Sequence, residues 1–161
     1  MATNPSAWIY PGLPKDEATL AAIGKIALRH GQLDYAFKMT VRTLAGVSHD
    51  EAVAATAMQG SRELRRRVRN LARKRFGDAD VLVRLDALLE RARRATDRRN
   101  ALLHGLWAKE MDGGPVFREH DKDDFGPVPS VTELEALADD LNRIAYDLHT
   151  ARLEGFIHEA M

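Results

Sequence analysis

Apolar residues recur every three or four positions along most of the chain, which is the period of an amphipathic helix. The pattern predicts helices over residues 16–45, 80–106 and 130–159, and a helical stretch over 49–76 that Gly60-Ser61 could divide in two. Short connections join these helices, so the predicted fold is an all-α, antiparallel bundle of four to five helices in a single domain, 1–161. This architecture would bury the apolar side of every helix in one core.

The apolar stripes indicate which side of each helix faces that core. They are formed by Leu20, Ile23, Ala27, Phe37, Val41 and Leu44 in the first helix, by Leu85, Leu88, Leu89, Ala92, Leu103 and Leu106 in the third, and by Leu134, Leu137, Leu141, Ile144, Leu148 and Leu153 in the last. Gly24 and Gly31 weaken the first helix locally, and we expect another helix to approach closely there.

Helix ends are marked by residues with known positional preferences. Glycine commonly follows a helix, and serine or aspartate commonly precedes one as the N-cap. The predicted ends are Gly46 and Gly77, and the predicted N-caps are Ser48, Asp78 and Ser130, the last with Glu133 completing a capping box.

Two segments lack the helical pattern. Residues 1–14 contain several prolines and predict an extended arm that lies on the body of the protein or on a partner, anchored by Trp8, Ile9 and Tyr10. Residues 110–129 contain Asp112-Gly113-Gly114, a turn signal, and predict a loop or short hairpin before the last helix.

The composition of the chain is typical of a globular protein. The 161 residues are 45% hydrophobic and 30% charged, which is enough to build a core and keep a solvated surface. Absence of cysteine excludes disulfides and thiolate metal sites and favours a reducing, cytoplasmic compartment. No signal-peptide pattern and no long apolar run occur, so neither export nor a membrane association is expected.

The zero net charge hides a strong segregation of charge. Residues 60–109 carry 15 lysines and arginines against 6 acidic residues, whereas residues 110–161 carry 4 against 13. The two stretches could attract each other within a bundle or across a dimer, or the basic stretch could form a surface for phosphates. In the second case we expect RNA binding at Arg65, Arg66, Arg69 and Arg73.

Candidate chemistry is concentrated near the end of the third helix, in the sequence from Arg99 to Gly105. At about 100° per residue, Arg99 falls inside the apolar face, while Asn100 and His104 lie on its edge as neighbours four residues apart. Asp97 lies almost in line with His104. A guanidinium on an apolar face is costly unless it finds partners.

The first helix carries a matching irregularity. His30 and Asp34 are four residues apart and fall within its apolar stripe, where an imidazole and a carboxylate are unusual. Asp34 is the natural counter-ion for a buried Arg99. The pair could be a purely structural polar network, or Asp34 could orient Arg99 as support for a functional site, and the two interpretations are compatible.

The motif Arg99-Asn100-Ala101-Leu102-Leu103-His104-Gly105 resembles the signature of HEPN domains, in which an arginine is followed by a polar residue and, a few positions later, by a histidine. HEPN domains are all-α bundles of prokaryotic toxins, defence systems and nucleotide-associated modules. The resemblance rests on about seven residues, on the order of the helices and on the length of the chain.

The resemblance implies metal-independent cleavage of RNA at the cleft of a homodimer, in a defence or toxin–antitoxin system with a protein antitoxin as partner. His104 would transfer a proton, Arg99 would hold the scissile phosphate, and Asn100 would orient His104 or the ribose, with His30, Asp34 and Asp97 in support. The RNA 2′-hydroxyl would be the nucleophile, so no cofactor is expected.

Two other functions fit the same sequence. One is a non-catalytic helical interaction module, or scaffold, in which Arg99 and His104 are structural. The other is a sensor of a small molecule or nucleotide, with a pocket between the helices. The remaining histidines show no metal-binding spacing, so no metal site is predicted.

Overall fold

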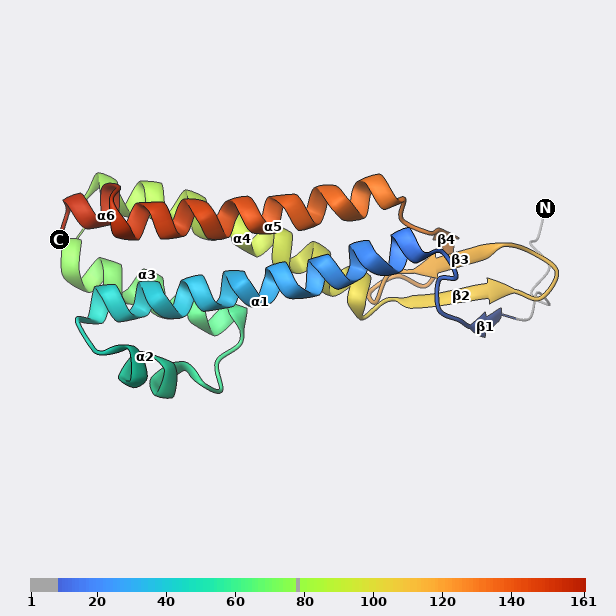
Figure 1. The fold of residues 1–161 in the computed structure, drawn as a ribbon, viewed down its shortest axis with the longest axis horizontal. Coiled ribbons are helices and arrows are strands. Elements are labelled where there is room, and N and C mark those ends of the chain that lie inside the picture. Colours follow the sequence, from blue (N-terminus) through green and yellow to red (C-terminus); the bar gives the residue numbers. More distant parts are fainter. Residues whose placement is uncertain (1–8, 78) are drawn as a thin grey trace.

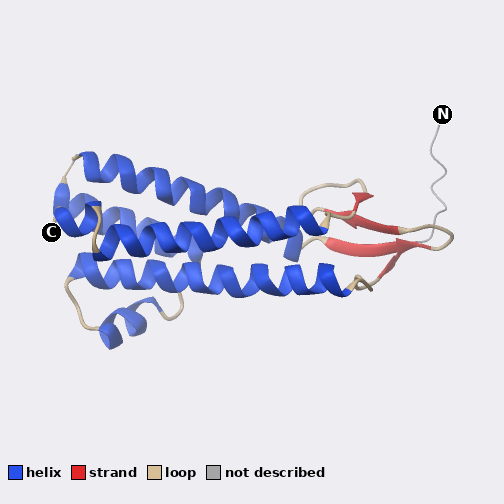
Figure 2. Cartoon of the chain, turned by 45° about the horizontal axis from the view of Figure 1, so that its top comes forward, coloured by secondary structure: helices blue, strands red, loops and turns tan. Residues whose placement is uncertain are grey.

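The computed structural model describes residues 9–77 and 79–161 and is mainly helical (Figure 1). The helices are α1 (Glu17–Ala45), α2 (His49–Thr56), α3 (Ser61–Phe76), α4 (Asp80–Leu103), α5 (Val131–Leu153) and the single-turn α6 (Phe156–Glu159). Five of them, α1 to α5, pack together, and the long ones run beside one another. A small sheet lies at one end of the bundle, and α6 lies at the other (Figures 1 and 2).

The core lies where α1 packs against α5 and α3, and α4 against α5 and α3. Its largest fully buried side chains in the helices include Phe37, Ile26, Leu33, Leu64, Leu85, Leu134, Leu141, Ile144 and Leu148. The stripes predicted for α4 and α5 are largely confirmed. In α1 the predicted stripe is confirmed at Phe37, Val41 and Leu44. In its first half Leu20 and Ala27 are exposed, and Ala22 and Ile26 are buried instead.

The close helix approach predicted at Gly24 and Gly31 is wrong. A β-carbon added at either position would meet no atom of the described residues within 4 Å. Both glycines lie on the outer side of α1, because the stripe that packs on α5 and α3 passes through Ile26 and Leu33 instead.

Most helix ends lie where local signals predicted them. Gly46 ends α1 in the left-handed conformation, with φ 68°, and Gly77 follows α3. Ser48 and Ser130 cap α2 and α5 with complete capping boxes. Asp78, the predicted cap of α4, lies outside the described residues. The last helix is shorter than predicted, because α5 ends at Leu153 and Gly155 separates it from α6.

The expectation of an all-α fold is wrong in one region. Four antiparallel strands, β1 (Ile9–Pro11), β2 (Leu106–Glu110), β3 (Pro115–Arg118) and β4 (Gly126–Pro127), form a sheet in the order β1-β2-β3-β4 before the last helix. The predicted hairpin is confirmed, but it begins at Leu106, so α4 ends three residues earlier than expected. Pairing explains the difference, since Trp107 lies opposite Phe117 with ring centres 5.0 Å apart.

The N-terminal arm supplies β1, the outer strand of that sheet. Of the arm, residues 9–11 lie extended on the body, and Gly12 donates a backbone hydrogen bond to the carbonyl oxygen of Trp107 at 3.0 Å. Ile9 and Tyr10 are 37% and 50% exposed, so backbone pairing rather than side-chain burial holds the arm. Trp8, the third predicted anchor, lies outside the described residues.

Gly105 is required by close packing between the end of α4 and β3. A β-carbon at this position would lie 2.5 Å from the Phe117 ring and 2.7 Å from the carbonyl oxygen of Ala101. We therefore expect Gly105→Ala to lower the free energy of unfolding by about 1–3 kcal/mol, as overpacking does.

Urea denaturation measures this change, with Gly24→Ala as the control. An added methyl group at Gly24 meets open space on a helix, so that variant should gain roughly 0.5–1 kcal/mol. Equal stabilities for the two variants would contradict the packing role of Gly105.

Candidate active site

The motif from Arg99 to Gly105 lies at the junction between the bundle and the sheet. Arg99 and Asn100 occupy the last full turn of α4, and His104 is its C-cap, with φ −97° and ψ −3°. The His104 amide donates to the carbonyl oxygen of Asn100 at 2.9 Å, which completes the helix. The His104 side chain is exposed, so its imidazole is available to a ligand.

Arg99 is half-buried and is held by its neighbour. Its Nη1 donates to Oδ1 of Asn100 at 2.9 Å, while its buried Nε has no hydrogen-bond partner in the structure. Among the ion pairs of the described residues, none joins Arg99 to a carboxylate. The predicted ion pair between Asp34 and Arg99 is therefore wrong.

Asp34 instead is half-buried and belongs to a polar cluster with the buried His30 and Ser61. Ser61 Oγ donates to Asp34 Oδ1 at 2.5 Å, and His30 Nε2 lies 3.1 Å from the same hydroxyl. Because the single hydroxyl proton is directed to Asp34, His30 Nε2 donates to Ser61 Oγ. His30 Nδ1 is 3.8 Å from Asp34 Oδ2. This cluster joins the middle of α1 to the start of α3.

Sequence reasoning missed Ser61 as a member of this cluster. Its position directly after Gly60 predicted a break between two helices, but nothing in the sequence predicted a buried polar contact. Ser61 and His30 are each 8% exposed, so their polar atoms depend on one another for hydrogen bonds.

The surroundings of His30 shift its protonation equilibrium. Burial lowers the pKa of His30, the charge of Asp34 opposes this shift, and the positive charges of Arg99 and Arg65 lower the pKa further. The lowered pKa favours the neutral imidazole of His30 near pH 7.

Asp34 is expected to stabilise the fold through Ser61 and not through Arg99. Asp34→Ala removes the acceptor of a buried hydroxyl, and we expect a loss of about 1–3 kcal/mol in the free energy of unfolding. Thermal or urea unfolding measures the loss. The control is Asp139→Ala on the exposed side of α5, which should change stability by no more than about 0.5 kcal/mol. Equal losses would contradict the role given to the cluster.

Asp97, predicted to support His104, is exposed and engaged elsewhere. Its carboxylate accepts from Arg93 Nη1 at 2.7 Å, and Arg93 also pairs with Glu90 at 2.8 Å. These contacts join one turn of α4 to the next and involve no residue of the polar cluster.

A basic hollow of about 220 Å³ lies between α3 and α4. It is lined by Arg62, Arg65, Arg66, Arg69, Leu89, Glu90 and Arg93. Three of the four arginines predicted to bind RNA line it, whereas Arg73 does not. Arg62 and Arg93 also line the hollow, although the sequence did not predict them. The packing of α3 against α4 decides which arginines of the two helices face the same groove.

The arginines of this hollow differ in how far they are already paired. Arg69 binds Asp86 at 2.7 Å, and Arg65 contacts Thr96 at 3.4 Å. Arg62 and Arg66 form no ion pair with any described residue. These two guanidinium groups are therefore the ones available to an anion in the groove.

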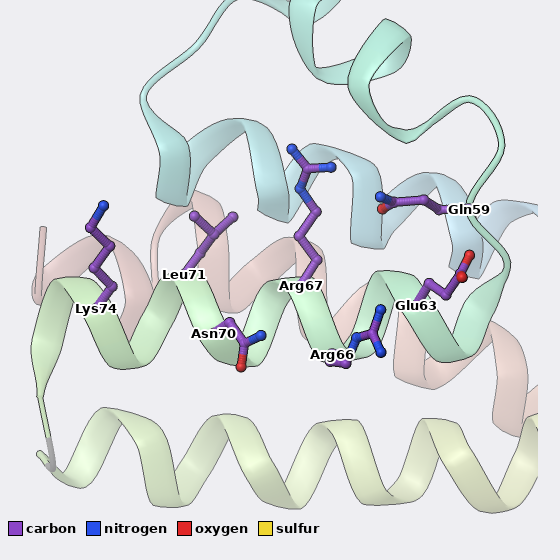
Figure 3. Close-up of a pocket in the computed structure, with 7 residues that line it drawn as sticks. All are labelled: Gln59, Glu63, Arg66, Arg67, Asn70, Leu71 and Lys74. Carbon is purple, nitrogen blue, oxygen red and sulfur yellow. The ribbon is translucent and has the colours of Figure 1, made fainter.

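A second hollow of about 390 Å³ lies on the other side of α3 (Figure 3). Its lining consists of Gln59, Glu63, Arg66, Arg67, Asn70, Leu71 and Lys74. Arg66 borders both hollows, so the basic surface continues around α3. Arg67 donates to the carbonyl oxygen of Ala55 at 2.9 Å, which ties α3 to the end of α2.

His120 is a further polar residue at the motif, and the sequence gave no reason to connect it with His104. The ring centres of the two histidines are 6.4 Å apart, and both side chains are exposed. Beside His120, Glu119 binds Arg98 at 2.8 Å and Lys122 at 2.9 Å. Hydrogen bonds from these two cations lower the pKa of Glu119, so its carboxylate stays charged.

The described residues contain no group of three or more histidine, cysteine or acidic side chains that could hold a metal ion. In the same residues, no helix combines the length and apolar character needed to cross a bilayer. The sequence matches no protein-family model, and no curated protein or solved structure matches it.

Proposed function

We propose that this protein is a HEPN-like helical homodimer that cleaves RNA without a metal ion. The observation that carries the proposal is the state of Arg99, a half-buried arginine that forms no ion pair with a carboxylate of residues 9–77 or 79–161, about one turn before the exposed His104. A cation kept free of carboxylates at a helix end that also presents an imidazole is suited to a phosphodiester.

The reaction follows from the properties of the two side chains. The RNA 2′-hydroxyl attacks the adjacent phosphorus, and Arg99 stabilises the charge that develops on the phosphate oxygens. His104 transfers a proton, since an imidazole can accept or donate near neutral pH. Asn100 accepts a hydrogen bond from Arg99 Nη1, and it therefore orients the guanidinium rather than the histidine.

The basic hollow supplies a path for the RNA backbone toward this site. Glu90, Arg93, Asp97, Asn100 and His104 are spaced three or four residues apart, so they share one face of α4. Arg93 borders the hollow, and His104 lies roughly 16 Å further along the same face. Arg62 and Arg66 would contact phosphates upstream of the cleavage point.

The test is an RNA cleavage assay with EDTA present. We expect the purified protein to cut single-stranded RNA at the same rate with and without the chelator, leaving 2′,3′-cyclic phosphate and 5′-hydroxyl ends. Mass spectrometry of the fragments identifies these ends. Loss of cleavage in EDTA would contradict the metal-independent mechanism, and absence of cleavage under both conditions would contradict the proposed function.

The homodimer is part of the same proposal, since two copies of the motif would face each other across the cleft. Light scattering should then give about twice the 18.0 kDa mass of one chain. In a defence or toxin–antitoxin system, a partner protein would block the cleft until the nuclease is needed.

A non-catalytic interaction module is the second candidate. Large apolar side chains at the surface of the helices favour it, because Leu28 is 72% exposed on α1 and Tyr146 is 68% exposed on α5. This candidate predicts no RNA cleavage by the wild-type protein, so the assay above separates the two.

A further inference from the structure

We propose that His120 is a second catalytic histidine, and that it and His104 divide between them the two proton transfers of RNA cleavage. This inference rests on the proposed function. It extends that function because the motif from Arg99 to Gly105 contains only one histidine. The two side chains come from different elements, the C-cap of α4 and the turn that follows β3.

The register of the sheet is what brings the two histidines together. Leu106 pairs with Arg118 at the end of the β2–β3 ladder nearest the bundle. His104 lies two residues before Leu106, and His120 lies two residues after Arg118. Both histidines therefore leave the same end of the ladder at equal distances from its last pair, and their ring centres lie 6.4 Å apart.

Ion pairs tie the turn that carries His120 to α4. Glu119 accepts from Arg98 Nη1 at 2.8 Å, and Arg98 directly precedes Arg99 in the helix. The second contact of Glu119, with Lys122, closes the turn on the far side of His120. These contacts fix the backbone next to His120 relative to the last turns of α4.

The spacing of the rings suits a ligand between them. They meet edge-on at 63° and not face to face, and both side chains are exposed. Proton transfer needs heavy-atom distances of about 2.6–3.2 Å. A phosphodiester can satisfy this requirement with both rings when the attacking and leaving oxygens lie on opposite sides of phosphorus.

The chemistry requires two different protonation states at once. A neutral imidazole takes the proton of the 2′-hydroxyl as the bond from the 2′-oxygen to phosphorus forms. A protonated imidazole gives its proton to the 5′-oxygen as the bond from phosphorus to that oxygen breaks. The products are a 2′,3′-cyclic phosphate and a 5′-hydroxyl, and one proton has been exchanged at each histidine, so no oxidant, metal or added reactant is needed.

The experiment compares His120→Ala and His120→Gln with wild type in the EDTA cleavage assay, using the full chain. We expect both variants to lose about 10²–10⁴-fold in rate, because neither side chain can transfer a proton. Unfolding curves should match wild type, since the His120 side chain is exposed. The control is His158→Ala, an exposed histidine in α6 at the opposite end of the bundle, which should keep full activity (Figure 1).

A second substrate distinguishes a proton donor from a residue that only shapes the site. RNA with sulfur in place of the 5′-bridging oxygen has a leaving group that departs without protonation. This substrate should restore cleavage to the alanine variant of only one of the two histidines, the general acid. The other variant should remain slow, because the proton of its 2′-hydroxyl still has to be removed.

The outcomes separate this inference from the proposed function. Loss of cleavage in His104→Ala with wild-type rates in both His120 variants would overturn the role of His120 and leave the nuclease standing. Rescue of both histidine variants by sulfur, or of neither, would overturn the division of proton transfers. Absence of cleavage by wild type would overturn both proposals.

Discussion

Replacing His104 by alanine is expected to lower the rate of RNA cleavage about 10²–10⁴-fold, the usual contribution of a general acid or base. The loss should appear in the rate of the bound complex and not in RNA affinity, because Arg99 and the basic hollow remain. The fold should be unaffected, since the side chain is exposed and the helix is completed by the backbone amide of residue 104.

Single-turnover cleavage kinetics with saturating protein measure this effect, and a filter-binding titration reports the affinity. His158→Ala is again the control for loss of an exposed histidine. Equal cleavage rates in wild type and His104→Ala would show that the motif is not the catalytic site. A large drop in affinity would assign His104 to RNA binding instead.

Arg99→Met is expected to separate function from stability. Cleavage should fall by about 10²–10³-fold, as when a preorganised donor to a developing oxyanion is removed. The free energy of unfolding should stay the same or rise, because the buried Nε of Arg99 has no partner and a methionine fills a similar volume without a polar group to satisfy. Functional residues often carry such a cost in stability.

Arg91→Met is the matched control on the same helix. Arg91 is half-buried like Arg99 but binds Asp147 at 2.8 Å, so this variant should lose up to about 1 kcal/mol of stability and keep its cleavage activity. Urea unfolding and the cleavage assay measure both properties. If Arg99→Met were the less stable of the two, the guanidinium would be a structural group and the interaction module would be favoured.

The polar cluster shows how far helical periodicity alone can lead. The unusual positions of His30, Asp34 and Arg99 were visible from their spacing, because an apolar stripe predicts which residues face inward. Their partners were not visible, since Ser61 comes from another helix, 27 residues after Asp34. The angle of a residue on its own helix says nothing of which neighbouring residue it meets.

The sheet shows a second limit. The turn signal Asp112-Gly113-Gly114 predicted a hairpin, but the apolar pattern also predicted that the preceding helix extends to Leu106. Pairing of Trp107 with Phe117, and of the N-terminal arm with β2, outweighed that local preference. Strand pairing is a non-local interaction, so its extent depends on segments that are distant in the sequence.

By itself, the sequence determined most helix ends, among them those at Gly46, Ser48 and Ser130, because capping serines and helix-ending glycines act within a few residues. It also placed Arg99, Asn100 and His104 together at the end of one helix. Only the tertiary structure decided that Asp34 binds Ser61 rather than Arg99, that Arg62 and Arg93 share a groove, and that His120 lies opposite His104. The reason is physical: these contacts depend on how helices pack and on the register of a sheet, which join residues that no local rule connects.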